Sequence, residues 1–197
     1  MCGISRRDVL RNLTVGALGG SVLNIIPIEA AELAHQMVHQ EKSTTPTGKY
    51  TPKFFPTEEY QTLTVLCDMI IPKDAKSAGA IEAGAPEFID LLCSENEEYQ
   101  LLLGGGLMWL ANFCVDRYSQ TFLQCQPPQR KEALDLIAFK RNAKTDPSLS
   151  QGVRFFGVLR HMTTDAFYTS KIGIEDLQYI GNTALAEFPG CPPFPQE

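Results

Sequence analysis

The sequence predicts an all-α fold, an irregular bundle of about five to six helices followed by a proline-rich, irregular C-terminal tail. Two observations predict this class. Apolar residues recur at three- and four-residue spacing, the period of one helix face, in each of the longer segments. No segment alternates apolar and polar residues as a half-buried strand would, and glycine and proline separate the helical segments.

The composition is that of an ordinary globular domain with an acidic balance. The chain has 197 residues, 44% of them hydrophobic and 20% charged, so it is long enough to bury a core. Its formal net charge is -6, and basic residues cluster only near the N-terminus, which argues against a nucleic-acid partner. None of the six cysteines stands in a C-x-x-C motif, so neither a zinc ribbon nor a c-type haem attachment site is indicated.

The N-terminal segment has the pattern of an export signal. Arg6 and Arg7 lie in SRRDVLR, which resembles the twin-arginine motif S-R-R-x-F-L-K, and no charged residue follows between Arg11 and Glu29. A membrane-spanning helix needs about 20 strongly apolar residues, so this glycine-containing stretch fits a signal better. We therefore assign residues 1–34 to a twin-arginine signal segment rather than to an amphipathic helix of the domain. No Ala-x-Ala cleavage site follows, so both cleavage at an atypical site and retention as an anchor stay open.

Residues 35–56 are predicted to link the signal to the folded body, because threonine and proline are frequent there. At the start of this linker, His35 and His39 have the i, i+4 spacing of a metal pair on one helix face. A zinc protease would have glutamate beside the first histidine, where this chain has Gln36. No third histidine is near, and the sequence predicts no metal site.

The helical body is predicted to begin at Thr57. We expect Thr57 to cap the first helix, Glu58 and Glu59 to favour its first turn, and Pro72 to end it. The apolar face of this helix contains Tyr60, Leu63, Leu66, Cys67 and Ile70. Pro86 suits the first turn of a second helix over residues 86–95.

The next helical segment, residues 99–122, contains three consecutive glycines at 104–106. Together they disfavour a helix by about 3 kcal/mol relative to alanine. We expect a break or a close helix contact at these glycines. A phosphate-binding loop is not expected, because no lysine follows them as a P-loop requires.

Two further helices complete the predicted bundle. The first covers residues 129–143 and the second residues 153–170. Their predicted core residues are Ala133, Leu134, Ile137 and Ala138 in the first and Val153, Phe156, Leu159 and Phe167 in the second. His161 lies within the second helix, where a lone histidine is more often packed and hydrogen-bonded than catalytic. After Gly173 the chain is expected to be irregular.

Cys191 and Cys125 are the candidates for an inter-chain disulfide. Loss of the signal would remove Cys2 and leave an odd number of cysteines, and in an oxidising compartment an unpaired cysteine favours an intermolecular bond. Cys191 lies on the proline-rich tail, and Cys125 lies just before Pro127. An internal Cys114–Cys125 or Cys125–Cys191 bridge, with the remaining cysteines free, is an equally good interpretation.

The usual catalytic motifs are absent from the sequence. There is no G-x-S-x-G elbow, no G-x-G-x-x-G after a strand and no H-E-x-x-H pair. Aspartates are scattered, and no spacing proposes a catalytic pair. The sequence therefore predicts a body without catalytic residues and without a cofactor of its own.

Several segments, in order, resemble the gluconate 2-dehydrogenase subunit 3 family. TLTVLCDMIIP ending at Pro72, GA at 79–80 and AGAPEFID at 83–90 resemble the opening of the family pattern. FFGVLRHMTTDAFY at 155–168 is similar to its long helix, and YIGN at 179–182 and FPGC at 188–191 are similar to its closing segments. The likeness covers residues 57–191. It departs from the family at Ala166, where glycine is usual, and at Ile180, which separates the Tyr-Gly pair.

The resemblance implies that residues 57–197 are a helical small-subunit domain without catalytic activity. Such a subunit escorts, exports and stabilises a large FAD-binding dehydrogenase of the glucose–methanol–choline type, which acts on CH–OH groups of sugars or sugar derivatives. FAD is then expected in the partner, and in some complexes a cytochrome c accepts the electrons. The expected location is the periplasm or cell envelope, reached by the twin-arginine route.

The C-terminal tail is the predicted partner interface on this interpretation. An obligate interface of this kind would bury more than about 2,000 Å². The tail residues proposed for it are Phe188, Pro189, Cys191, Pro192, Pro193 and Phe194. The same residues could instead close over the core of this chain. The alternative function is an independent envelope enzyme or ligand-binding module with a pocket near His161.

Overall fold

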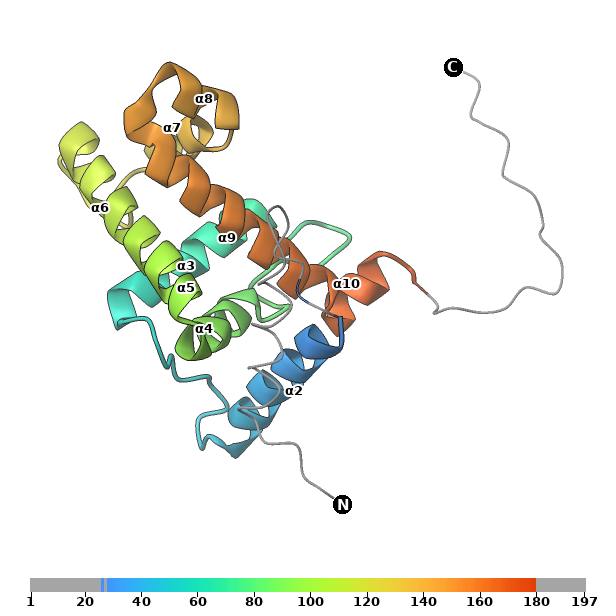
Figure 1. Cartoon of the computed structure of the whole chain (residues 1–197). Helices are drawn as coiled ribbons and strands as arrows, with labels where there is room; N and C mark the ends of the chain where they lie inside the picture. Colours follow the sequence, from blue (N-terminus) through green and yellow to red (C-terminus); the bar gives the residue numbers. More distant parts are fainter. Residues whose placement is uncertain (1–25, 27, 180–197) are drawn as a thin grey trace, which may run out of the picture.

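The computed structural model of the chain describes Ile26 and residues 28–179, and these residues form an irregular bundle around one long helix, α9 (Ser150–Tyr168). Figure 1 shows α9 running diagonally through the middle of the molecule. Its neighbours in the bundle include α3 (Thr57–Ile70), α4 (Ala85–Glu95), α6 (Gly105–Tyr118), α7 (Pro127–Ile137), α8 (Lys140–Thr145) and α10 (Lys171–Asp176). No strand occurs in the described part of the chain, where six helices are 11 residues or longer. The predicted all-α class is therefore confirmed.

Residues 28–44 form a helix that the sequence did not predict. This helix, α2 (Ile28–Thr44), buries Ala31, Ala34 and Val38 and packs against α4. An ion pair of 2.5 Å between Lys42 Nζ and Glu87 Oε1 joins the same two helices. The stretch that we divided between signal and linker thus includes a helix of the bundle. Its buried residues are mostly alanines, too weakly apolar to stand out beside the signal.

The first two helices of the body begin and end close to the predicted positions. α3 begins at Thr57 and ends before Pro72, but Thr57 is not its cap: the Pro56 carbonyl accepts a hydrogen bond of 2.8 Å from Tyr60 N. The helix therefore starts one residue earlier than a threonine cap would set it. α4 has Pro86 in its first turn, as predicted. The expected apolar face of α3 is inward, with Leu63, Leu66 and Cys67 buried.

The segment with three glycines contains a π-helical turn and is closely packed. The short helix α5 (Glu97–Tyr99) leads into a π-helical turn, η1 (Gln100–Gly104), and α6 follows. At Gly106, an added Cβ would lie 2.0 Å from Phe155 Cδ2, and at Gly152 it would lie 2.3 Å from Trp109 Cζ3. The ring of Phe155 from α9 thus packs against Gly106 of α6, and the ring of Trp109 from α6 packs against Gly152 of α9. The expected close contact is confirmed, whereas the helical backbone continues from the π-helical turn into α6 without a break at Gly104 and Gly105.

Two predicted boundaries are wrong. The helix expected over 129–143 is two helices, α7 and α8, because Phe139 is extended and Asn142 Nδ2 donates a hydrogen bond of 2.8 Å to the Leu136 carbonyl near the end of α7. Irregular structure was expected after Gly173, yet this glycine lies within α10. Ser170 Oγ caps that helix by accepting a hydrogen bond of 3.1 Å from Gly173 N.

Candidate subunit interface

The outer face of α6 carries exposed apolar side chains. Met108 is 63% exposed and Val115 is 47% exposed, and Ala111 lies between them on the same exposed face. We call these three residues the α6 row. Their spacing of three and four residues places them along one line of the helix, away from the buried side that contains Leu107, Leu110 and Cys114. Exposed apolar side chains in a line on a helix are typical of a surface that packs against another element.

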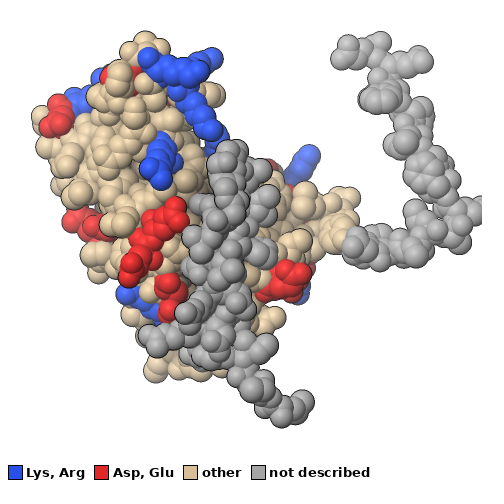
Figure 2. All heavy atoms as spheres, in the orientation of Figure 1, with Lys and Arg blue, Asp and Glu red and all other residues tan. Residues whose placement is uncertain are grey.

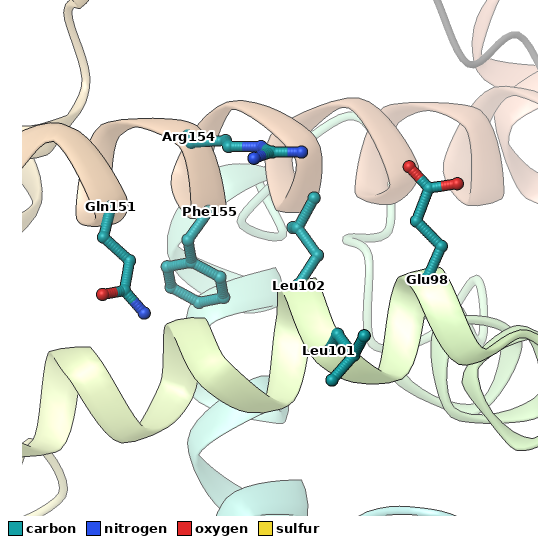
Figure 3. A pocket seen from close by; sticks show the side chains of 6 residues that line it. All are labelled: Glu98, Leu101, Leu102, Gln151, Arg154 and Phe155. Atoms are coloured by element: carbon teal, nitrogen blue, oxygen red, sulfur yellow. The ribbon is translucent and has the colours of Figure 1, made fainter.

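A cleft adjoins the N-terminal end of α6, where η1 meets α9. Its volume is about 400 Å³, and it is lined by Glu98, Leu101, Leu102, Gln151, Arg154 and Phe155. Figure 3 shows Arg154 from α9 and Glu98 from the facing segment at the rim, with the Phe155 ring directed toward η1 and α6. Leu101 is 80% exposed. Gln151 Nε2 donates a hydrogen bond of 3.1 Å to the Gly105 carbonyl, which ties the two helices together at one end of this η1–α9 cleft.

The α6 row and the η1–α9 cleft together are suited to binding a protein surface. The cleft has an apolar floor with one cation and one anion at its rim, and the α6 row supplies further apolar area beside it. Such an arrangement can bury a leucine- or phenylalanine-sized side chain and pair its polar neighbours. The η1–α9 cleft lacks the nucleophile–base pair that acyl or phosphoryl transfer would need.

His161 lies on α9 beside a second cavity, of about 640 Å³. Its Nε2 atom is 3.5 Å from Asp165 Oδ2, one helical turn away. Burial raises the pKa of the Asp165 carboxyl, and the nearby His161 opposes that shift. The histidine thus lies within ion-pair distance of an aspartate of its own helix. A pocket near His161, which the alternative function requires, is present.

Cys114 and Cys125, two of the cysteines considered for a disulfide, are buried next to each other. Cys125 is only 2% exposed, so the expectation of an accessible thiol at this position is wrong: Phe122 and Cys125 turn into the core after α6 ends. Burial, together with the neighbouring Cys125 side chain, raises the pKa of the Cys114 thiol to about 12. Both thiols are free in the structure. Cys191, the other candidate for the inter-chain disulfide, lies outside the described residues.

His35 and His39 lie on α2 in different surroundings. His35 Nε2 is 3.0 Å from Thr169 Oγ1, and its ring centroid is 4.9 Å from that of Phe88. Burial lowers the pKa of His35, whereas His39 is exposed on the same helix. Within residues 28–179 no group of three or more histidine, cysteine, aspartate or glutamate side chains is placed to hold a metal ion. His35 instead joins α2 to the end of α9.

Asp90 is a buried acidic residue whose role the sequence analysis missed. It lies on α4 and accepts four hydrogen bonds from the loop that precedes α3. Oδ2 accepts from Tyr50 Oη at 2.9 Å and Lys53 N at 2.7 Å, and Oδ1 accepts from Phe54 N at 3.2 Å and Phe55 N at 2.9 Å. Its place among Phe88, Ile89, Leu91 and Leu92 was the available signal, because an aspartate on an apolar helix face needs buried partners.

The remaining predicted site residues cannot be placed. Arg6 and Arg7 of the signal lie outside the described residues. The same holds for the tail residues Phe188, Pro189, Cys191, Pro192, Pro193 and Phe194. No helix within residues 28–179 combines the length and the hydropathy that a bilayer-spanning segment needs.

Comparison with known proteins identifies the family. Residues 57–190 match the family model described as gluconate 2-dehydrogenase subunit 3, from the start of α3 to one residue before Cys191. This chain belongs to that family. The family name describes one subunit of a dehydrogenase complex, and the resemblance noted in the sequence is thereby confirmed. Comparisons with curated proteins and with solved structures found no match.

Proposed function

We propose that this protein is the non-catalytic small subunit of a FAD-dependent dehydrogenase of the glucose–methanol–choline type, which it escorts, exports and stabilises. The dehydrogenase oxidises CH–OH groups of sugars or sugar derivatives, and FAD is bound by the large subunit. The family match over residues 57–190 is the observation that carries this proposal. In some such complexes a cytochrome c subunit receives the electrons.

The physical basis of the escort role is burial of apolar surface. The α6 row and Leu101 leave large side chains in water, and each square ångström of apolar surface removed from water contributes about 25 cal/mol. We expect the proline-rich tail to add further apolar contacts with the partner. A stable obligate complex buries more than about 2,000 Å², so the α6 row and the η1–α9 cleft form only part of the proposed interface.

Export is the second part of the role. The twin-arginine segment on this chain directs the folded pair across the membrane, so that the large subunit takes up FAD before it leaves the cytoplasm. The complex then works in the periplasm or at the cell envelope, where retention of the uncleaved signal would hold it to the membrane.

Purification of the native protein from the cell envelope tests the proposal. We expect a yellow flavoprotein to accompany the tagged full chain in stoichiometric amount, with dehydrogenase activity toward a sugar or polyol. A colourless chain that purifies alone would contradict the proposal. The alternative, an independent enzyme or ligand-binding module, has the cavity near His161 in its favour and predicts that the isolated chain is active or binds a ligand without a partner.

Substitutions in the α6 row test the interface. Met108→Glu and Val115→Glu each place a charge on a face that the proposal buries, and we expect at least tenfold weaker binding of the flavoprotein. Because both side chains are exposed in the isolated chain, its thermal unfolding temperature should change little. Lys76→Glu, on the exposed loop after α3, is the control and should leave binding unchanged. If all three variants bind the flavoprotein as tightly as the wild type does, the α6 row is not part of the interface.

A further inference from the structure

Gly157 lies in the middle of α9 without a packing reason in the described structure. Glycine disfavours helix interiors relative to alanine. At Gly106 and Gly152 an aromatic ring of the facing helix explains the missing side chain. A Cβ on Gly157 would meet no described atom within 4 Å. The glycine instead opens the surface of α9 at the cavity near His161.

This cavity, between α8 and α9, combines an apolar floor with cations around it. Its volume is about 640 Å³; Val153, Gly157 and Val158 contribute apolar surface from α9, and Ala143 contributes it from α8. The cations that line it are Lys140, Arg154 and Arg160. Its size lies in the range of binding pockets rather than of packing defects.

The three cations form no ion pair with any described carboxylate. The chain as a whole has a net charge of -6, so they are a local excess of positive charge on an acidic protein. Figure 2 shows Lys and Arg side chains gathered at the end of the molecule that α7 and α8 form. An anionic occupant would find three partners here that the described part of the chain leaves unused.

We propose that this α8–α9 cavity binds an acidic segment of the dehydrogenase subunit, whose carboxylates pair with Arg154, Arg160 and Lys140 and whose apolar side chain packs over Gly157. The inference rests on the proposed function and adds the chemistry of the partner. Arg154 and Arg160 leave α9 about 9 Å apart along its axis, at about 1.5 Å per residue. This separation suits two carboxylates of one segment better than one small anion. Arg154 also lines the η1–α9 cleft, so the cavity continues the candidate interface.

Substitution of Gly157 tests binding in the α8–α9 cavity without destabilising the fold. Gly157→Leu fills the cavity from a position where the added Cβ meets no described atom, and leucine favours a helix more than glycine does. We expect the full-length variant to unfold at the same or a higher temperature than the wild type. Its affinity for the co-purifying flavoprotein should nevertheless fall at least tenfold. Gly157→Ala, which adds one methyl group, should be as stable and bind at an intermediate affinity.

Charge reversal tests the cationic rim. Arg154→Glu with Arg160→Glu should weaken binding at least tenfold in low salt and flatten the dependence of Kd on salt, since the pairing is electrostatic. Lys76→Glu is the matched control and should behave as the wild type. If the wild-type complex forms but Gly157→Leu and the double variant keep its Kd, the inference is wrong and the proposed function stands. If no flavoprotein accompanies the wild type, both are wrong.

Discussion

At the scale of single residues, Asp90 shows how one carboxylate organises a loop without a cation. Its two oxygens accept three backbone N–H groups and one phenol O–H, so the loop from Tyr50 to Phe55 is held on α4. The residue is fully buried. The partial charges of several convergent N–H groups replace the water that the carboxylate loses on burial. Burial and the nearby Asp90 charge also raise the pKa of Tyr50, which keeps its hydroxyl a donor.

Replacement of Asp90 by asparagine should destabilise the protein by about 3 kcal/mol, because one carboxylate oxygen becomes an NH₂ group that faces two donors. Tyr50→Phe is the control: it removes one donor and should cost about 1 kcal/mol. Urea denaturation of both variants and of the wild type gives the two free energies of unfolding. Equal and small losses would show that the four hydrogen bonds do not hold this loop.

The sequence predicted much of the core but not its polar contacts. Leu66, Leu134 and Leu159 are buried where helical spacing placed them. That spacing could not indicate that Asp90 is buried and His35 partly buried, each with a partner, because the groups they bond to come from the loop before α3 and from the end of α9. From sequence alone, a single aspartate on an apolar helix face is equally consistent with a catalytic or binding role and with a role in stabilising the fold.

At the scale of the elements, α6 and α9 approach closely because each offers a glycine to a ring of the other. The sequence indicated an interruption or a close contact at residues 104–106, but it could not identify which glycine makes the contact. Phe155, the partner of Gly106, belongs to another helix. The same limit explains the break between α7 and α8, which depends on a side-chain hydrogen bond from Asn142. Local helix propensity therefore predicts neither the contact at Gly106 nor the break between α7 and α8.

Two neighbouring glycines of α6 allow a matched comparison. Gly106→Ala should destabilise the protein by about 2 kcal/mol, since the added Cβ would lie within 3 Å of Cβ and two ring atoms of Phe155 and must displace them. Gly105→Ala meets only Gln151 Nε2, at 3.7 Å, and should be neutral or stabilise by up to about 1 kcal/mol through helix propensity. Calorimetric melting of both variants measures the difference. Similar melting temperatures would mean that α6 and α9 can separate at no cost.

At the scale of the whole molecule, the candidate interface was only partly predictable. The sequence pointed to the tail that follows residue 179, whereas the described surface adds the α6 row, the η1–α9 cleft and the α8–α9 cavity. Met108 and Val115 belong to a segment that is apolar on several sides, so periodicity alone could not tell which residues remain exposed. That choice depends on where α9 packs. The family match, from residue 57 to residue 190, includes this described surface and the tail as far as Gly190.

Export of the partner can be tested at the twin-arginine pair. Arg6→Lys with Arg7→Lys keeps both positive charges and removes the guanidinium groups that define the motif. We expect the flavoprotein and its dehydrogenase activity to stay in the cytoplasm, because in the proposed complex the flavoprotein crosses the membrane on the signal of this chain. Cell fractionation, with the activity assay and an immunoblot of both subunits in each fraction, measures the outcome.

Arg11→Lys is the matched control for that experiment. It makes the same chemical change nearby, and lysine is the residue of the S-R-R-x-F-L-K pattern at that position, so export should continue. If the double variant still delivers active flavoprotein to the envelope, the large subunit has its own route and this chain does not escort it. If both subunits remain together in the cytoplasm as an active complex, assembly precedes export. In that case the surface described above acts before the signal does.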